Sequence, residues 1–189
     1  MIFLMGLFTA EYGPVELEAL LESIAKGDQE ALAALYDHAR GAVYGLALSY
    51  LKNGHDADDV AQDTFVRIWE KAPLYRPQGS PMAWILTIAK NLSLMRLREQ
   101  GKTADLAPED WESLAIPSPS VNVEERHALH AALTALDDTG RQVILLHAVS
   151  GLKHREIAEL LEIPLATALS KYHRGLKKLR TLLEGGDAS

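Results

Sequence analysis

Apolar side chains recur every three or four residues along most of the chain, the spacing of one face of an α-helix. In the N-terminal half this pattern predicts helices over about 15–26, 28–51, 56–72 and 81–98. In the C-terminal half it predicts helices over about 123–136, 138–150, 153–161 and 165–183. No segment shows the sustained alternation of a half-buried strand. The sequence therefore predicts an all-α fold.

Polar residues and breakers mark the ends of these helices. Asp28 can cap the second helix, and Asn53-Gly54 can end it. Asp56 is expected to cap the third helix, with Asp59 at N3 as a weaker capping-box acid. Pro81 suits the first turn of the fourth helix. Asp137 or Asp138 is expected to cap the helix that ends near Ser150-Gly151.

A segment of different composition divides the chain. Residues 103–123 hold three prolines, four acids and no basic residue, and their periodicity is poor. We expect a flexible acidic Pro/Ser-containing linker over 101–123 between two small helical domains, at 15–100 and 124–184. Residues 185–189 form a tail. Residues 1–14 are interpreted as an N-terminal extension, or as the product of a start codon upstream of the native one.

Composition and charge narrow the class of protein. The chain has 189 residues, of which 48% are hydrophobic and 6% aromatic, and it contains no cysteine. The lack of cysteine excludes a disulfide scaffold, a thiolate metal site and a cysteine nucleophile. The net charge is −7, which by itself disfavours nucleic-acid binding. However, residues 165–183 carry five basic side chains and no acid, so phosphate can be met locally.

The last two predicted helices form a helix-turn-helix pattern. A helix over 153–161 has core-spaced apolar residues, a turn at 162–164 contains Pro164, and the basic helix follows. In such motifs the second helix enters the major groove of DNA. The alternative is a basic face that only meets solvent, which the absence of any acid on this helix disfavours.

Four sequence blocks occur in a characteristic order: GDQEALAALYDHA, DADDVAQDTFVRIW, YRPQGSPMAWILTIAKNLSLMRLRE and GLKHREIAELLEIPLATALSKYHRGLKKLR. In this order they resemble the successive regions of extracytoplasmic-function sigma factors of the sigma-70 family. The resemblance covers about 15–98 and 124–183. It implies a transcription initiation factor that gives RNA polymerase its promoter specificity, with a region 2 domain followed by a region 4 domain.

The second block resembles the segment that binds the coiled coil of the polymerase β′ clamp. Opposite the apolar stripe of that helix lie five polar residues, Asp58, Asp59, Gln62, Asp63 and Arg67. An acidic helix face suits a basic partner helix and speeds encounter with it. Solvation and complementation of the helix dipole by the acids are the alternative explanation.

The third block resembles the region that melts and reads the minus-ten element. The loop over 74–80, with Tyr75 and Arg76, would pocket a flipped-out base of the nontemplate strand. The following helix would present Lys90, Asn91, Arg96 and Arg98 to the DNA, where asparagine can pair with a base edge and cations can hold a single strand. Trp69 and Trp84 are expected in the core, because each lies on or beside an apolar stripe.

The fourth block resembles the domain that reads the minus-thirty-five element as duplex. The expected DNA-binding residues of its second helix are Thr167, Ser170, Lys171, His173, Arg174, Lys177 and Lys178. The chain departs from the family pattern at Ala166, Leu169 and Met95, where the family often has glycine, a basic residue and aspartate. These departures bear on which bases are read.

The resemblance also implies the partners. They are core RNA polymerase, contacted at the β′ clamp coiled coil and the β flap, promoter DNA, and an anti-sigma factor that holds the protein inactive. We expect a cytoplasmic protein without enzymatic activity, small-molecule substrate or cofactor. No metal site is expected from Glu124, His127 and His130, because no second cluster completes a coordination shell. A conventional helix-turn-helix regulator and a sigma-mimic adaptor remain the alternatives.

Overall fold

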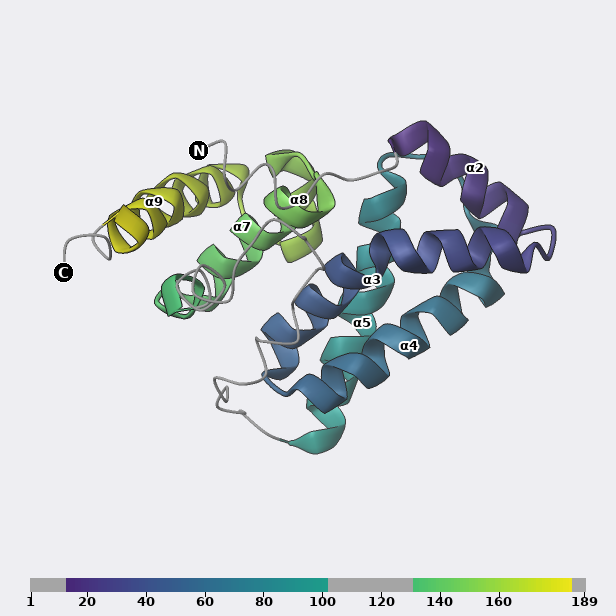
Figure 1. Cartoon of the computed structure of the whole chain (residues 1–189), viewed down its shortest axis with the longest axis horizontal. Helices are drawn as coiled ribbons and strands as arrows, with labels where there is room; N and C mark the ends of the chain where they lie inside the picture. The colour runs from purple at the N-terminus through teal and green to yellow at the C-terminus, as the bar shows by residue number, and fades with distance from the viewer. Residues whose placement is uncertain (1–12, 102–130, 185–189) are drawn as a thin grey trace.

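The computed structural model describes residues 13–101 and 131–184, and both parts are built of helices (Figure 1). The first part contains α2 (Pro14–Ile24), α3 (Gln29–Leu51), α4 (Gly54–Lys71), the 3-10 turn η1 (Ala72–Leu74) and α5 (Pro81–Gln100). The second contains α7 (Asp138–Ser150), α8 (His154–Leu161) and α9 (Leu165–Glu184). Residues 131–134 are also helical. Within these ranges no strand occurs, so the all-α prediction is confirmed.

Helices α3, α4 and α5 pack against one another, and α2 crosses the end of α3. As predicted, Asp28 caps α3, accepting hydrogen bonds from the backbone N–H groups of Glu30 and Ala31. Pro81 occupies the first turn of α5, and the Ser80 hydroxyl caps this helix. The caps fix where each helix begins and hence which face it turns to the core.

The predicted cap of α4 was wrong. The helix begins at Gly54, and Asn53 is its N-cap: the Asn53 side-chain oxygen accepts from the N–H of Asp56 at 2.9 Å. Asp56 and Asp59 therefore lie inside the first turns and do not form the expected capping box. Because Asn53 satisfies the backbone donor, the Asp56 carboxylate can bind Arg96 on α5 instead, at 2.9 Å.

The second part is a helix-turn-helix packed on α7. Asp137 caps α7, and the chain turns between α8 and α9 at Glu162, whose φ of 57° lies in the left-handed region. The end of α8 at Leu161 and the start of α9 at Leu165 are as predicted. Small Ala168 on α9 is fully buried, and a Cβ at Gly175 would lie 2.5 Å from the Ile144 side chain. These small residues let α9 approach α7 closely.

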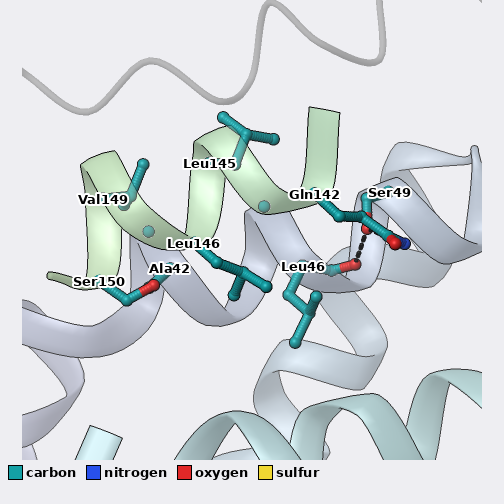
Figure 2. Close-up of a pocket in the computed structure, with 10 residues that line it drawn as sticks. Ala42, Leu46, Ser49, Gln142, Leu145, Leu146, Val149 and Ser150 are labelled. Atoms are coloured by element: carbon teal, nitrogen blue, oxygen red, sulfur yellow. Dashed lines mark hydrogen bonds between the residues drawn. The ribbon is translucent and has the colours of Figure 1, made fainter. Parts of the chain in front are cut away.

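The two parts contact each other directly. Helix α7 packs on α3, and α8 packs on α5. One hydrophobic cluster continues from the α2–α5 unit into α7, α8 and α9. Figure 2 shows the seam, a mostly apolar crevice lined by small residues of α3 such as Ala42 and by residues of α7 that include Leu146 and Val149.

Polar contacts also join the two units. The Gln142 amide donates to the Ser49 hydroxyl at 3.0 Å within the interface, and this hydroxyl donates to the backbone oxygen of Leu46 (Figure 2). Lys52 pairs with Asp138 at 3.0 Å. A third bridge joins Lys90 to the end of α8. Polar and apolar contacts together thus hold the two units side by side.

Several predictions lie outside the described residues. They are the extension over 1–12, most of the linker over 102–123, the start of the following helix to residue 130, and the tail over 185–189. None of the described helices is long and apolar enough to cross a bilayer.

Candidate nucleic-acid interface

The outer face of α9 gathers four of the seven residues predicted there. Ser170, His173, Arg174 and Lys177 are all exposed and follow one another at i, i+3, i+4 and i+7. That spacing places them on one side of the helix. The opposite side holds Ala168 and Leu179, which are buried against the rest of the motif. The face is basic and open to solvent.

The remaining three predicted residues on α9 have other surroundings. Lys171 forms an ion pair with Asp137, and Lys178 donates to the backbone oxygen of Ala135 at 2.5 Å. The hydrogen bond from Lys171 lowers the pKa of the Asp137 carboxyl below its usual value. Thr167 is half-buried. The two lysines therefore tie α9 to the chain just before α7.

The predicted residues on α5 and its preceding loop divide into two groups. Arg76, Asn91 and Arg98 are exposed. Asn91 and Arg98 share one face of α5 with Thr87, also exposed, and with Met95, whose side chain is 47% exposed. Thr87, Asn91, Met95 and Arg98 follow at helical spacing, so they form one continuous surface.

Tyr75, Arg96 and Lys90 face other parts of the protein. The Tyr75 ring packs edge-on against Trp84, with ring centroids 5.1 Å apart, and burial raises the pKa of its phenol. Arg96 donates to the carboxylates of Asp56 and Asp59 at 2.9 and 3.0 Å. The hydrogen bond from Gln100, and then those from Arg96, lower the pKa of Asp56.

Lys90 is the clearest difference from the predicted surface. Its residue is only 8% exposed, and its ammonium donates to the backbone oxygen of Leu160 at 2.8 Å and to the Glu162 carboxylate at 2.5 Å. The ammonium lowers the pKa of Glu162. In this arrangement Lys90 joins α5 to the end of α8 and is buried between the two helices.

The outer face of α4 carries the residues predicted to dock on a protein. Gln62, Asp63 and Arg67 are exposed, and Arg67 pairs with Glu70 at 2.8 Å. Among them lies Val66, which is 56% exposed. The other two predicted residues are engaged: Asp58 pairs with Arg40 at 3.4 Å, and Asp59 binds Arg96. The open part of the face is therefore polar with one apolar centre.

Comparison with known proteins assigns these surfaces to two conserved regions. Sigma-70 region 2 matches residues 35–103, and sigma-70 region 4 matches residues 126–179. The ECF RNA polymerase sigma factor SigK of Mycolicibacterium vanbaalenii is 32% identical over 176 residues, covering 89% of each chain. SigK of Mycobacterium tuberculosis strain H37Ra is 31% identical and covers 89% of this chain and 94% of its own. This chain belongs to the ECF sigma factors of RNA polymerase.

Solved structures agree with this assignment. The structure of CnrH in complex with the cytosolic domain of CnrY has a TM-score of 0.61 and 27% identity, covering 90% of this chain and 98% of CnrH. The sigma factor RpoE from Bartonella quintana, solved with the anti-sigma factor NepR, has a TM-score of 0.59 at 23% identity and shares the fold. The ECF sigma factor described here directs promoter-specific initiation by RNA polymerase, and its family regulates transcription without being enzymatic.

The structure adds residues of this sigma factor that the sequence reasoning missed. Thr87 joins the exposed face of α5, and Val66 lies at the centre of the α4 face. The i, i+4 step from Thr87 to Asn91 and the i, i+3 step from Asp63 to Val66 are visible in the sequence. Neither residue is charged, and the sequence prediction was based on charged and polar contact residues.

A cluster of rings supports the helix-turn-helix of the sigma factor. His147 on α7, His154 on α8 and Tyr172 on α9 pack with ring centroids 4.5–4.9 Å apart. His147 Nδ1 lies 2.8 Å from the backbone oxygen of Leu152. Within the described ranges no group of three metal-ligating side chains converges. The cluster is a packing element between the three helices.

Proposed function

We propose that this sigma factor divides its work among three exposed helix faces. The unit over 15–100 docks on core polymerase through α4 and opens the minus-ten element with α5. The unit over 124–184 binds the minus-thirty-five duplex with α9, and residues 101–123 connect them. The observation that carries the proposal is the open basic face of Ser170, His173, Arg174 and Lys177 on the second helix of the helix-turn-helix.

On α9, Ser170 lies nearest the bases, and Arg174 and Lys177 meet phosphate. Arginine can pair with guanine or phosphate, and serine can donate to or accept from a base edge. Lys171, Lys178 and Thr167 position the helix in the free protein, because two of them bind protein groups and the third is half-buried.

On α5, Asn91 and Arg98 contact the single strand of the minus-ten element, with Arg76 from the loop before the helix. Their exposure supports this role. Tyr75 and Arg96 orient the loop and the helix through Trp84 and the aspartates of α4. Lys90 becomes available to DNA once the contact between α5 and α8 is released.

On α4, Asp63, Gln62 and Arg67 around Val66 form the dock for the β′ clamp coiled coil, and the α7–α9 unit meets the β flap. Rim charges steer association, whereas an apolar centre supplies burial on contact. Asp58 and Asp59 support the face through their pairs with Arg40 and Arg96.

We also propose an anti-sigma factor as the protein's regulator in the cytoplasm. The similarity to CnrH, which was solved in complex with the cytosolic domain of CnrY, supports a protein partner of this kind.

Run-off transcription with core polymerase tests the proposed function. The wild-type chain should start at a defined site that core polymerase alone ignores. Arg174→Ala should weaken use of promoters that depend on the upstream element. Asn91→Ala should weaken opening, and Asp63→Lys should lower affinity for core polymerase. Arg155→Ala, an exposed change outside the three faces, is the matched control.

Failure to start at any defined site would overturn the proposal. Tight, specific duplex binding by the free chain as a dimer would instead indicate a conventional helix-turn-helix regulator. Binding to an anti-sigma factor without any effect on initiation would indicate a sigma-mimic adaptor.

A further inference from the structure

Two parallel rows of side chains cover the exposed surface of α9. One row contains Leu165, Leu169, His173 and Lys177, and the other contains Ala166, Ser170, Arg174 and Lys178; all eight residues are exposed. Each row steps by four residues, so its members lie one above the next along the helix. The first half of this surface carries no charge, whereas the second half is basic.

The two leucines are not part of the protein core. Leu165 is 44% exposed and Leu169 is 37% exposed, and neither belongs to a hydrophobic cluster. Ala168, which lies between the two leucines in the sequence, is fully buried and anchors the helix. The leucine side chains thus lie beside Ser170 on the outside of the helix.

The order of the two halves matches the geometry of a helix entering DNA. The N-terminal residues of a recognition helix approach the base edges, and phosphates are met by surrounding cations. The half of α9 nearest the bases therefore offers methyl groups and one hydroxyl. It lacks the arginine or lysine that pairs with the O6 and N7 acceptors of guanine. In the major groove the apolar feature of a base pair is the C5-methyl group of thymine.

We propose that Leu165 and Leu169 read thymine methyl groups in the minus-thirty-five duplex, so that apolar contact sets the sequence preference of this sigma factor there. The inference rests on the proposed role of α9 in duplex binding. Ser170, one residue from Leu169, can donate a hydrogen bond to thymine O4 at the same step. Arg174 and Lys177 hold the helix on the backbone.

Charge favours DNA over a protein as the occupant of this surface. The row of side chains that begins with Leu165 and Leu169 continues along the helix into His173 and Lys177. Two carboxylates near α9 in the described residues are bound within the protein, Glu162 by Lys90 and Asp137 by Lys171. An apolar patch that runs into an exposed basic surface complements a groove with methyl groups between phosphates.

Replacement of thymine by uracil tests the proposal, because it removes only the methyl group. A promoter library with a randomised minus-thirty-five region is first transcribed by the holoenzyme, and the preferred sequence is read from the products. Each thymine in that element is then replaced by uracil in turn. Loss of one contacted methyl should weaken initiation at subsaturating holoenzyme about fourfold, the value of burying one such group.

Variants assign the effect to a side chain. Leu169→Ala should abolish the difference between thymine and uracil at one position, and Leu165→Ala at a neighbouring one. Leu182→Ala, which truncates a leucine equally exposed at the other end of α9, should leave both differences unchanged. Thermal unfolding checks that the variants fold, which their exposed positions favour.

The outcomes separate the inference from the proposed function. Equal use of thymine and uracil at every position of a required element would overturn the inference alone. The same holds if Leu169→Ala weakens binding to a protein partner but leaves promoter preference unchanged. If no sequence in the library supports initiation, the proposed function itself is wrong.

Discussion

The Lys90 ammonium on α5 lies 2.5 Å from the Glu162 carboxylate in the turn between α8 and α9. A residue of the unit proposed to open the minus-ten element thus binds the motif proposed to read the minus-thirty-five element. The two promoter elements are separated by about 25 base pairs, or roughly 85 Å of duplex at about 3.4 Å per base pair. Helices that pack directly lie about 8–10 Å apart. If the two units read these elements as proposed, the contact opens before both elements are bound at once.

We predict that Glu162→Lys shifts the free protein towards an open arrangement. The substitution places a second cation beside Lys90, and the like charges repel each other. Small-angle X-ray scattering, or a spin-label distance between α3 and α7, should report a larger mean separation. Glu159→Lys is the control, because Glu159 is exposed on α8 and pairs with Arg155 of the same helix. An unchanged distance in Glu162→Lys would show that the apolar seam alone holds the units together.

We predict that Asp137→Ala destabilises the α7–α9 unit more than Asp137→Asn. The carboxylate accepts from the Gly140 N–H as the cap of α7 and also binds Lys171 on α9. Alanine removes both interactions, and loss of a cap costs about 1 kcal/mol. Asparagine keeps the capping oxygen and loses mainly the exposed ion pair, which contributes little. Equal melting temperatures for the two variants would contradict this division.

The sequence predicted the helices well because caps and periodicity are local signals. Asp28 and Pro81 act where the pattern placed them, and Asp137 is the one of the two candidate aspartates that caps α7. The cap of α4 was misassigned because Asn53 and Asp56 are both good capping residues three positions apart. Local preference cannot choose between them. The choice depends on Arg96, which lies 40 residues away and binds Asp56.

The predicted DNA-binding residues fall into an exposed group and a group bound within the protein, and the sequence could not separate these groups for a similar reason. Basic residues of α5 and α9 were identified from charge, but charge does not tell an exposed cation from one that binds within the protein. Asn91 and Arg98 are open, whereas Lys90 and Arg96 have partners on other helices. Those partners come from contacts between elements distant in sequence. A single sequence carries no local signal for them.

We predict that Gly175→Ala weakens the packing of α9 on α7. A Cβ at this position would lie 2.5 Å from Cδ1 of Ile144, a side chain that is almost completely buried. Overpacking in a core costs about 1–3 kcal/mol, which exceeds the gain of up to about 1 kcal/mol from replacing glycine within a helix. Chemical denaturation should show a lower free energy of unfolding. The double variant with Ile144→Val, which removes Cδ1, should recover much of that loss.

We predict that stability falls as the pH drops from 7 towards 5, and that His154 causes much of the fall. Burial first, and then His147 and His173, lower the pKa of His154 from its ordinary value of 6.5. Its Nε2 atom is buried without a hydrogen-bond partner in the described part of the chain, and the rings of His147 and Tyr172 enclose it. The unfolded chain therefore binds this proton more readily than the folded one. Below about pH 6.5 that difference favours unfolding.

His154→Phe separates this effect from other titrations, because it keeps a ring in the cluster and removes the titrating group. Its free energy of unfolding should depend less on pH between 5 and 7 than that of the wild type. His55→Phe should follow the wild type, because His55 is exposed on α4. Asp56, Asp137 and Glu162 have lowered pKa values, so their contributions are lost only at more acidic pH. If the free energy of unfolding of His154→Phe depends on pH as strongly as that of the wild type, the titrating group lies elsewhere. The ring cluster would then support α9 only through packing.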